Sequence, residues 1–157
     1  KDGTITAANS SSISDGASAL ILASHEAAQR HGVKPLAKML GHATHSRHPS
    51  EFTIAPVGAI EKLMKKLGWG VNDVDLFEIN EAFAVVTLMA MDDLGLPHEK
   101  VNVFGGACAQ GHPIGSTGSR IIATLIHALR TKGGKRGIAS LCIGGGEATA
   151  VAVELMD

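Results

Sequence analysis

Several features that mark common protein classes are scarce in this sequence. Tyrosine is absent and aromatic residues make up 3% of the 157 residues, so an aromatic platform for stacking nucleic-acid bases is not expected. The 14 basic and 15 acidic residues give a net charge of −1 without a run of one sign, which leaves no basic surface for nucleic acid or an anionic membrane. We therefore expect neither nucleic acid nor membrane among the partners.

Long apolar runs and cysteines are also scarce. No apolar run reaches the roughly 18 residues that span a bilayer, and no basic start followed by an apolar run suggests a signal peptide. The two cysteines, Cys108 and Cys142, are too few for a disulfide framework. These absences favour a soluble, cytoplasmic protein with free thiols. Because the first residue is Lys1 rather than Met, we expect the chain to be a piece of a longer polypeptide.

Three common ligand motifs are missing. The stretch GHPIGSTGSR has no lysine after its last glycine, as a phosphate-binding loop requires, and the sequence has no G-x-G-x-x-G or G-x-S-x-G motif. Neither Cys142 nor His112 has further metal ligands at the usual short spacings. A resident metal or cofactor is therefore not expected.

Glycine, in contrast, is abundant: 19 of the 157 residues are glycine, about 12% of the chain against an average of about 7%. Two glycine-rich stretches stand out: NVFGGACAQGHPIGSTGSR, residues 102–120, contains His112, and LCIGGGEA, residues 141–148, contains Cys142. Glycine lets the backbone take positive φ and approach a ligand closely. In a third stretch, VDLFEINEAFAVV, residues 74–86, a strand-like run ends at Asn80. Because side chains at the carboxyl ends of strands line the usual crevice of an α/β sheet, the three stretches predict one site.

The amide, imidazole and thiol suit acyl transfer or enolate chemistry. A positive dipole or a histidine near Cys142 would lower the pKa of its thiol from about 8.5 and give a thiolate that acts as nucleophile or base. Backbone N–H groups in the turn after Cys142 would bind a developing oxyanion. On composition alone, a buried structural cysteine and a hydrogen-bonded structural histidine are an equally good interpretation.

Alternating strand-like and helix-like segments predict a layered α/β domain with a mixed sheet and helices on its faces. Ser24 and Gly32 are expected to cap the first helix, and the third helix is apolar nearly all round, which predicts burial on most of its circumference. Strands are expected at residues 4–8, 17–23, 36–47, 74–79, 101–104, 137–143 and 148–155, the last two as a hairpin, and helices at residues 25–31, 57–67, 82–94 and 116–131.

Three histidines, His42, His45 and His48, lie three residues apart in an extended run. Gly41 and Pro49 favour a strand leading into a loop over a helix, so His42 and His45 are expected to point to opposite faces. Solvated or loop histidines are favoured here over a metal site.

The glycine-rich stretches resemble signature blocks of the thiolase family. NEAFA at residues 80–84, GGACAQGHPIGSTGSR at 105–120 and CIGGGEA at 142–148 are similar to the three blocks of the C-terminal half of thiolases, and ITAANSSSISDGASALILAS at 5–24 resembles the end of the N-terminal half. The resemblance implies a thiolase-like layered α/β fold. It also implies that residues 1–32 end the N-terminal thiolase domain and that residues 33–157 form the C-terminal one.

The resemblance further implies an acyltransferase that joins two acetyl-CoA into acetoacetyl-CoA and CoA, or reverses this step on a 3-ketoacyl-CoA. Coenzyme A and its acyl thioesters would be substrates, not cofactors, and the loop HPSEFTIAP at residues 48–56 would lie near their pantetheine arm. The expected partners are the N-terminal half of the same protein and further copies, in a homodimer or homotetramer.

Roles for four residues follow from the same resemblance. Cys142 would be the general acid/base that takes the α-proton of acetyl-CoA or protonates the departing enolate. His112 would activate the nucleophile and donate to the thioester oxygen, with Asn80 binding a water that completes this oxyanion hole. The backbone N–H of Gly144 would serve a second oxyanion hole. The acyl-accepting cysteine of the family belongs to the N-terminal half, so the isolated chain is expected to be inactive.

Two alternatives stay open, and one residue departs from the family pattern. Cys108 stands where thiolases usually have an apolar residue, and we expect it to pack rather than to act as a nucleophile. A ketoacyl-synthase-like condensing enzyme would have histidine or asparagine in place of Cys142. A non-catalytic domain that binds acyl-CoA or associates with subunits would not need Asn80, His112 and Cys142 together.

Overall fold

A four-stranded sheet forms the centre of the molecule. The computed structural model describes residues 2–156, where the strands are β1 (Ala37–Ser46), β2 (Leu76–Ile79), β3 (Arg136–Ile143) and β4 (Glu147–Leu155). They lie in the order β1-β4-β3-β2. Strand β4 runs antiparallel to β1 and β3, whereas β2 runs parallel to β3. The predicted mixed sheet and its C-terminal hairpin are confirmed.

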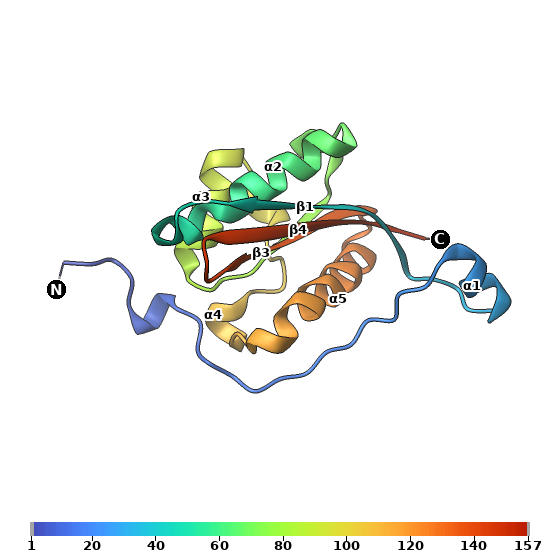
Figure 1. Cartoon of the computed structure of the whole chain (residues 1–157), viewed down its shortest axis with the longest axis horizontal. Helices are drawn as coiled ribbons and strands as arrows, with labels where there is room; N and C mark the ends of the chain where they lie inside the picture. The colour runs from blue at the N-terminus through green and yellow to red at the C-terminus, as the bar shows by residue number, and fades with distance from the viewer. Residues whose placement is uncertain (1, 157) are drawn as a thin grey trace.

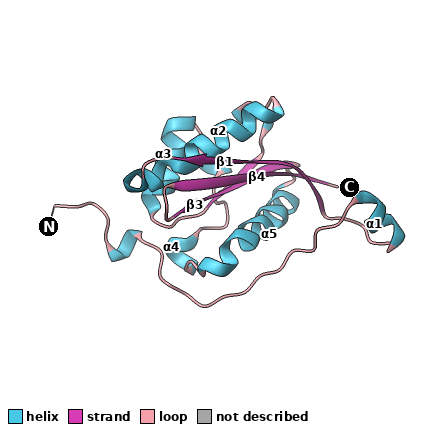
Figure 2. Cartoon of the chain, in the orientation of Figure 1, coloured by secondary structure: helices cyan, strands magenta, loops and turns pink. Residues whose placement is uncertain are grey.

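Helices cover both faces of this sheet (Figure 1). Helices α2 (Ala55–Leu67) and α3 (Ala84–Leu94) lie on one face, and α5 (Ile114–Lys132) lies on the other, preceded by the short α4 (Ala107–Gln110). The colouring by secondary structure in Figure 2 shows the strands as a layer between the two helical ones. The layered α/β fold is therefore confirmed. Within residues 2–156, none of the helices is long and apolar enough to cross a membrane.

Two apolar clusters fill the space between the layers. Ile60 and Leu63 of α2 belong to one cluster together with Phe77 of β2. Leu125 of α5 belongs to the other cluster together with Leu76, the neighbour of Phe77 in the same strand. Because successive side chains of a strand point to opposite faces, β2 is buried on both sides. The residue that follows this strand is thus fixed between two packed layers.

The N-terminal segment differs from the prediction. The strands expected at residues 4–8 and 17–23 are wrong: a 3₁₀ turn, η1 (Ala7–Asn9), replaces the first, and residues 17–23 form no regular element. The segment passes α4 and α5 on the side away from the sheet (Figure 1), and Ile21 is 97% exposed. A strand needs a neighbouring strand for its backbone N–H and C=O groups, and no strand within residues 2–156 pairs with residues 17–23. Helix α1 (His25–Arg30) follows as predicted, capped by Ser24.

Three other predictions need correction. Residues 101–104 make isolated bridges through Val101 and Val103 instead of a strand. The loop expected at residues 48–56 is largely a 3₁₀ helix, η2 (Pro49–Ile54). Helix α3 is buried on one side only, because Val86 and Ala90 are fully buried whereas Leu88 is 57% exposed. An apolar composition all round a helix therefore does not require burial all round.

The contact between α5 and β3 leads to a prediction about stability. Gly137 of β3 faces Leu125, and a Cβ at Gly137 would lie 2.6 Å from Leu125 Cδ1. Leu125 is fully buried and has no room to move away. We expect Gly137→Ala to lower the free energy of unfolding by about 1–3 kcal/mol through overpacking. The matched control is Gly118→Ala, since a Cβ there meets no atom within 4 Å and alanine is favoured in a helix by about 1 kcal/mol. Urea denaturation that showed Gly137→Ala to be as stable as Gly118→Ala would contradict the packing described.

Candidate active site

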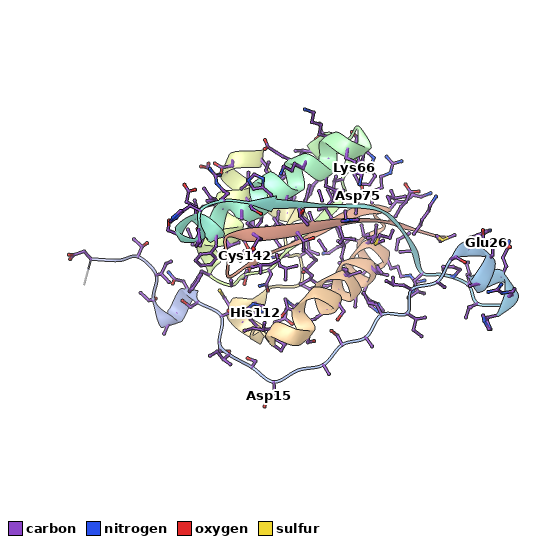
Figure 3. The ribbon with its side chains drawn as sticks, in the orientation of Figure 1. Asp15, Glu26, Lys66, Asp75, His112 and Cys142 are labelled. Carbon is purple, nitrogen blue, oxygen red and sulfur yellow. The ribbon has the colours of Figure 1, made fainter. Side chains whose placement is uncertain are left out.

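The predicted site residues lie at one end of the sheet, after β2, at the end of β3 and between α4 and α5. Asn80 directly follows β2, and its backbone N–H donates to the Ser140 carbonyl of β3 at 2.9 Å. Cys142 is the last residue but one of β3, just beyond the point where the parallel β2 ends. His112 lies between α4 and α5. Figure 3 labels His112 and Cys142 at the same end of the molecule, far from Asp75 at the start of β2.

The His112 ring is fixed by hydrogen bonds on both nitrogens. Its Nδ1 lies 2.8 Å from the hydroxyl of Thr117, which is fully buried. That hydroxyl donates its one hydrogen to the Pro113 carbonyl at 3.0 Å, so the Thr117 oxygen must accept from Nδ1–H. The neutral ring therefore has its proton on Nδ1 and a lone pair on Nε2. Nε2 faces the Asn80 side-chain amide, whose Nδ2 lies 3.4 Å away.

The surroundings of His112 favour the neutral ring. Burial is the main cause that lowers the pKa of His112, and the nearby positive charge of Arg120 lowers it further. The ring thus keeps its Nε2 lone pair at pH values where an ordinary histidine, with a pKa of about 6.5, is partly charged. An imidazole in this state is suited to accept a proton from a nucleophile and to return it as a donor.

The thiol of Cys142 is protonated in its resting state. The sequence led us to expect a lowered pKa, and this is wrong: burial raises the pKa of the Cys142 thiol, and a backbone hydrogen bond opposes the rise. Cys142 packs against the apolar cluster that contains Phe77, and an apolar environment disfavours the thiolate. A neutral thiol at this position is a proton donor, and it can act as a base only after another base has taken its proton or a nearby positive charge has stabilised the thiolate.

Asn80 has one side-chain atom without a partner. The residue is 1% exposed, and its Oδ1 has no hydrogen-bond partner among the described residues. A buried acceptor left unpaired costs about 1–3 kcal/mol, which a water or a substrate group at that position would recover. The amide is therefore placed to bind one more donor beside His112 Nε2.

Gly144 begins the turn that joins β3 to β4. The turn is closed by a hydrogen bond from the Gly146 N–H to the Ile143 carbonyl at 3.1 Å, and Gly144 itself is exposed. A Cβ at Gly144 would meet no atom within 4 Å, whereas Gly146 has a φ of +94° and faces the backbone of Arg47 at 2.5 Å from an ideal Cβ. The Gly144 backbone is thus accessible from solvent, two residues beyond Cys142.

Cys108 is held in a different way from Cys142. Its backbone N–H donates to Glu81 Oε2 at 3.0 Å, and its thiol lies 3.9 Å from the Glu81 carbonyl. Burial raises the pKa of the Cys108 thiol, and the negative charge of Glu81 raises it further. These contacts oppose a thiolate and describe a packed, neutral side chain at the start of α4.

The histidine run of β1 forms no cluster. His42 is exposed whereas His45 is half-buried, as the expected alternation requires, and the His45 ring packs against Gly58 of α2. His48 bonds Ser50 through Nδ1 at 2.8 Å. Among the described residues, no group of three or more histidine, cysteine, aspartate or glutamate side chains is placed to bind a metal ion.

Sequence reasoning missed four residues that hold this site together. Thr117 fixes the His112 tautomer, and the Ser12 carbonyl accepts from the His112 backbone N–H at 3.0 Å. Glu81 and Asn102 hydrogen bond to each other at 3.3 Å. Only Thr117 could have been found from the sequence. It lies four residues after Pro113 at the start of a helix, where a threonine hydroxyl can donate to the carbonyl four residues earlier.

Comparison with known proteins shows which family models match the sequence of this chain. The family model described as the thiolase C-terminal domain matches residues 33–155, and the thiolase N-terminal domain matches residues 1–26. The acetyl-CoA acetyltransferase of Chromobacterium violaceum is 50% identical over 154 residues, which are 98% of this chain and 39% of that protein. The cytosolic acetyl-CoA acetyltransferase of Mus musculus is 48% identical over 97% of this chain and 38% of its own length. The chain therefore spans about two fifths of the length of these curated relatives.

Solved structures agree with the sequence comparison. The human mitochondrial 3-ketoacyl-CoA thiolase in complex with CoA superposes with a TM-score of 0.97 and 47% identity, covering 100% of this chain and 40% of that one. The acetyl-CoA acetyltransferase of Bacillus anthracis gives a TM-score of 0.96 and 46% identity, with 99% and 40% covered. The fold around Asn80, His112 and Cys142 is thus shared with these proteins.

Proposed function

Since this chain belongs to the thiolase family, we propose that the protein containing it is an acetyl-CoA C-acetyltransferase. It would join two acetyl-CoA into acetoacetyl-CoA and free CoA, or split acetoacetyl-CoA in the reverse direction. The observation that carries the proposal is the lone pair on His112 Nε2, which faces the Asn80 side chain. Asn80 follows β2, and Cys142 lies at the end of the neighbouring strand β3. Relatives with acetyltransferase names over 98% and 97% of the chain support it.

In thiolysis, a cysteine thiol attacks the ketone carbon of acetoacetyl-CoA and gives its proton to His112 Nε2. The bond between the ketone carbon and the adjacent CH₂ then breaks, so that the acetyl group stays on sulfur and the enolate of acetyl-CoA leaves. The neutral thiol of Cys142 protonates this enolate carbon, which fits its raised pKa. CoA–SH then gives its proton to the Cys142 thiolate and attacks the acetyl carbon, and the departing thiolate of the nucleophilic cysteine takes back the proton from His112. Condensation follows the same steps backwards, with Cys142 as the base.

Two polar groups would stabilise the charge that develops on oxygen in these steps. Asn80 has a free Oδ1 for a bound water beside His112 Nε2, so that the water and the protonated ring can donate to one thioester oxygen. The backbone N–H of Gly144, an exposed residue, would serve a second oxygen. Each such donor contributes roughly 10²–10³-fold to an acyl-transfer rate.

The nucleophile is proposed to lie outside these residues. Cys108 is bound to Glu81 through its N–H and lies near the Glu81 carbonyl through its thiol, and Cys142 serves the enolate. Coenzyme A and its acyl thioesters are proposed as substrates without a resident cofactor. Two structural relatives, the human mitochondrial 3-ketoacyl-CoA thiolase and the Acat5 thiolase of Ascaris suum, were solved with coenzyme A, which supports the binding of CoA.

The location and assembly of the protein are also proposals. A cytoplasmic enzyme is supported by the cytosolic mouse and rat relatives at 48% and 47% identity, although a mitochondrial human relative is 48% identical as well. A homodimer or homotetramer is proposed on family likeness. Light scattering on the purified full-length protein tests it, and a monomer at micromolar concentration would contradict it.

The test of the function is a product balance in the full-length protein that contains these residues. We expect each acetoacetyl-CoA consumed with one CoA to give two acetyl-CoA. A hydrolase would instead release acetoacetate and free CoA, a ketoacyl-synthase-like enzyme would require malonyl-CoA and release CO₂, and a binding domain would show saturable binding without turnover. Any of these three results would overturn the proposal.

A further inference from the structure

Asn102 has an unusual backbone conformation next to the candidate site. It is a non-glycine residue with positive φ, at +46°, which asparagine tolerates better than most residues. Its backbone N–H donates to the Phe77 carbonyl of β2 at 2.9 Å. This bend places the Asn102 side chain along the outer edge of β2, which is one of the two edge strands of the sheet.

The side-chain amide of Asn102 acts there as a substitute strand. Its Oδ1 accepts from the Ile79 N–H and its Nδ2 donates to the Ile79 carbonyl, both at 2.8 Å. The peptide groups of Ile79 therefore point outward and are satisfied by Asn102, while the next N–H, that of Asn80, points inward to Ser140 of β3. Asn80 is thus fixed from both sides of its strand.

The second hydrogen of Asn102 Nδ2 continues this chain of contacts. It is donated to Glu81 Oε1 at 3.3 Å, and Glu81 Oε2 accepts from the Cys108 N–H at 3.0 Å. The carboxylate thereby caps α4, a helix without a capping side chain of its own, and a negative charge is favourable at a helix start. A Cβ at Gly106 would overlap the Glu81 carboxylate, so the close approach requires glycine there.

Helix α4 ends at Gln110, and its C-cap residue, Gly111, directly precedes His112. The contacts therefore run without a break from Ile79, beside Asn80, through Asn102 and Glu81 to the helix that leads into His112. We propose that Asn102 and Glu81 form a clamp that sets the separation of the Asn80 amide and the His112 ring, as positioning residues for the reaction. The inference rests on the proposed function for its kinetic consequence.

A cycle of two substitutions tests the clamp. In Glu81→Gln, one of the two accepting oxygens becomes a donor, and in Asn102→Asp the two donors of the amide become acceptors. Asn102→Asp breaks the 81–102 contact, and Glu81→Gln loses either that contact or the one to the Cys108 N–H, because one oxygen remains for two donors. In the double variant, the glutamine amide can donate to the aspartate and its oxygen can accept from the Cys108 N–H. The Ile79 carbonyl loses Asn102 as a donor and keeps the Thr87 hydroxyl at 3.4 Å. We expect each single change to lower kcat for thiolysis by about 10–100-fold with KM within a few-fold, because small misplacements of catalytic groups have effects of this size. The double variant is expected to regain several-fold.

Asp75→Asn is the matched control. Asp75 Oδ2 accepts from the backbone N–H groups of Lys135 and Arg136 at 2.7 and 2.8 Å, so it is a similar carboxylate bridge at the opposite end of β2 (Figure 3). Asp75→Asn is expected to leave kcat unchanged, whatever its effect on the melting temperature. Equal losses of kcat in Asp75→Asn and Glu81→Gln, or no recovery in the double variant, would overturn the clamp.

A second measurement does not depend on turnover. The nitrogen resonances of the His112 ring, followed against pH, are expected to change in Glu81→Gln and to stay unchanged in Asp75→Asn. If the wild-type protein does not cleave acetoacetyl-CoA, the proposed function fails, and the clamp is judged by these resonances alone. Unchanged resonances in Glu81→Gln would overturn it.

Discussion

Replacing His112 with alanine is expected to lower kcat for thiolysis of acetoacetyl-CoA by about 10³-fold or more in the full-length protein. General base catalysis alone contributes roughly 10²–10⁴-fold, and the loss of an oxyanion donor adds roughly 10²–10³-fold. Both depend on the Nε2 atom that Thr117 leaves unprotonated. Steady-state kinetics with acetoacetyl-CoA and CoA measures the effect.

The control for this prediction lies on the same helix layer. His127 is exposed on α5, and His127→Ala is expected to keep kcat within about two-fold. The pH profile gives a second check: burial and Arg120 lower the pKa of His112, so the wild-type rate should fall only below the ordinary value of about 6.5. A rate that survives in His112→Ala, or an acid limb well above pH 7, would contradict the role of this ring.

Replacing Glu78 with glutamine is expected to remove a large pH dependence of stability. Glu78 is 3% exposed and its Oε1 has no partner among the described residues. Burial raises the pKa of Glu78 to about 7, the charge of Glu81 raises it too, and Arg120 opposes the rise. Between about pH 4.5 and pH 7, Glu78 of the folded protein therefore keeps a proton that it has lost in the unfolded chain, where its pKa is near 4.5.

The sign of the effect follows from this difference. Below about pH 4.5 both states are protonated and the stabilising contribution is fully present, and it is lost as the pH rises through about 7. A shift of this size corresponds to on the order of 3 kcal/mol of unfolding free energy. Urea denaturation at pH 5 and pH 8 measures the unfolding free energy of Glu78→Gln relative to wild type. This difference should shift in favour of the variant by about that amount between pH 5 and pH 8. The exposed Glu61→Gln serves as control, and an equal pH dependence in wild type and Glu78→Gln would contradict the prediction.

Local patterns in the sequence were enough to predict most of the regular elements. The apolar stripe of α2 and the β3–β4 hairpin depend on residues close together in the chain, and both are confirmed. Residues 17–23 have the apolar composition of a strand but pair with none of the strands within residues 2–156. Pairing depends on a distant partner, which composition does not reveal.

The reactive side chains of the candidate site were visible in the sequence, whereas their supports were not. Asn80, His112 and Cys142 all lie beside glycines or at strand ends, and the fold brings Asn80 and His112 to 3.4 Å. The contact of Asn102 with Ile79 crosses 23 residues and needs a positive φ that no pattern predicts. The raised pKa of the Cys142 thiol depends on how deeply the end of β3 is packed, and this too is a tertiary property.

The most direct test of the account is to separate the two half-reactions in Cys142→Ala, with Cys108→Ala beside it. In the full-length protein, acetyl-CoA should still acetylate a third cysteine in Cys142→Ala, as peptide mass spectrometry would show. The same variant should cleave acetoacetyl-CoA at least about 10²-fold more slowly, since proton transfer to the enolate is lost, whereas Cys108→Ala should do both at nearly wild-type rates. An acetyl group found on Cys142 or Cys108 of the wild type, or full turnover by Cys142→Ala, would contradict the assignment of Cys142 as the acid/base of a thiolase.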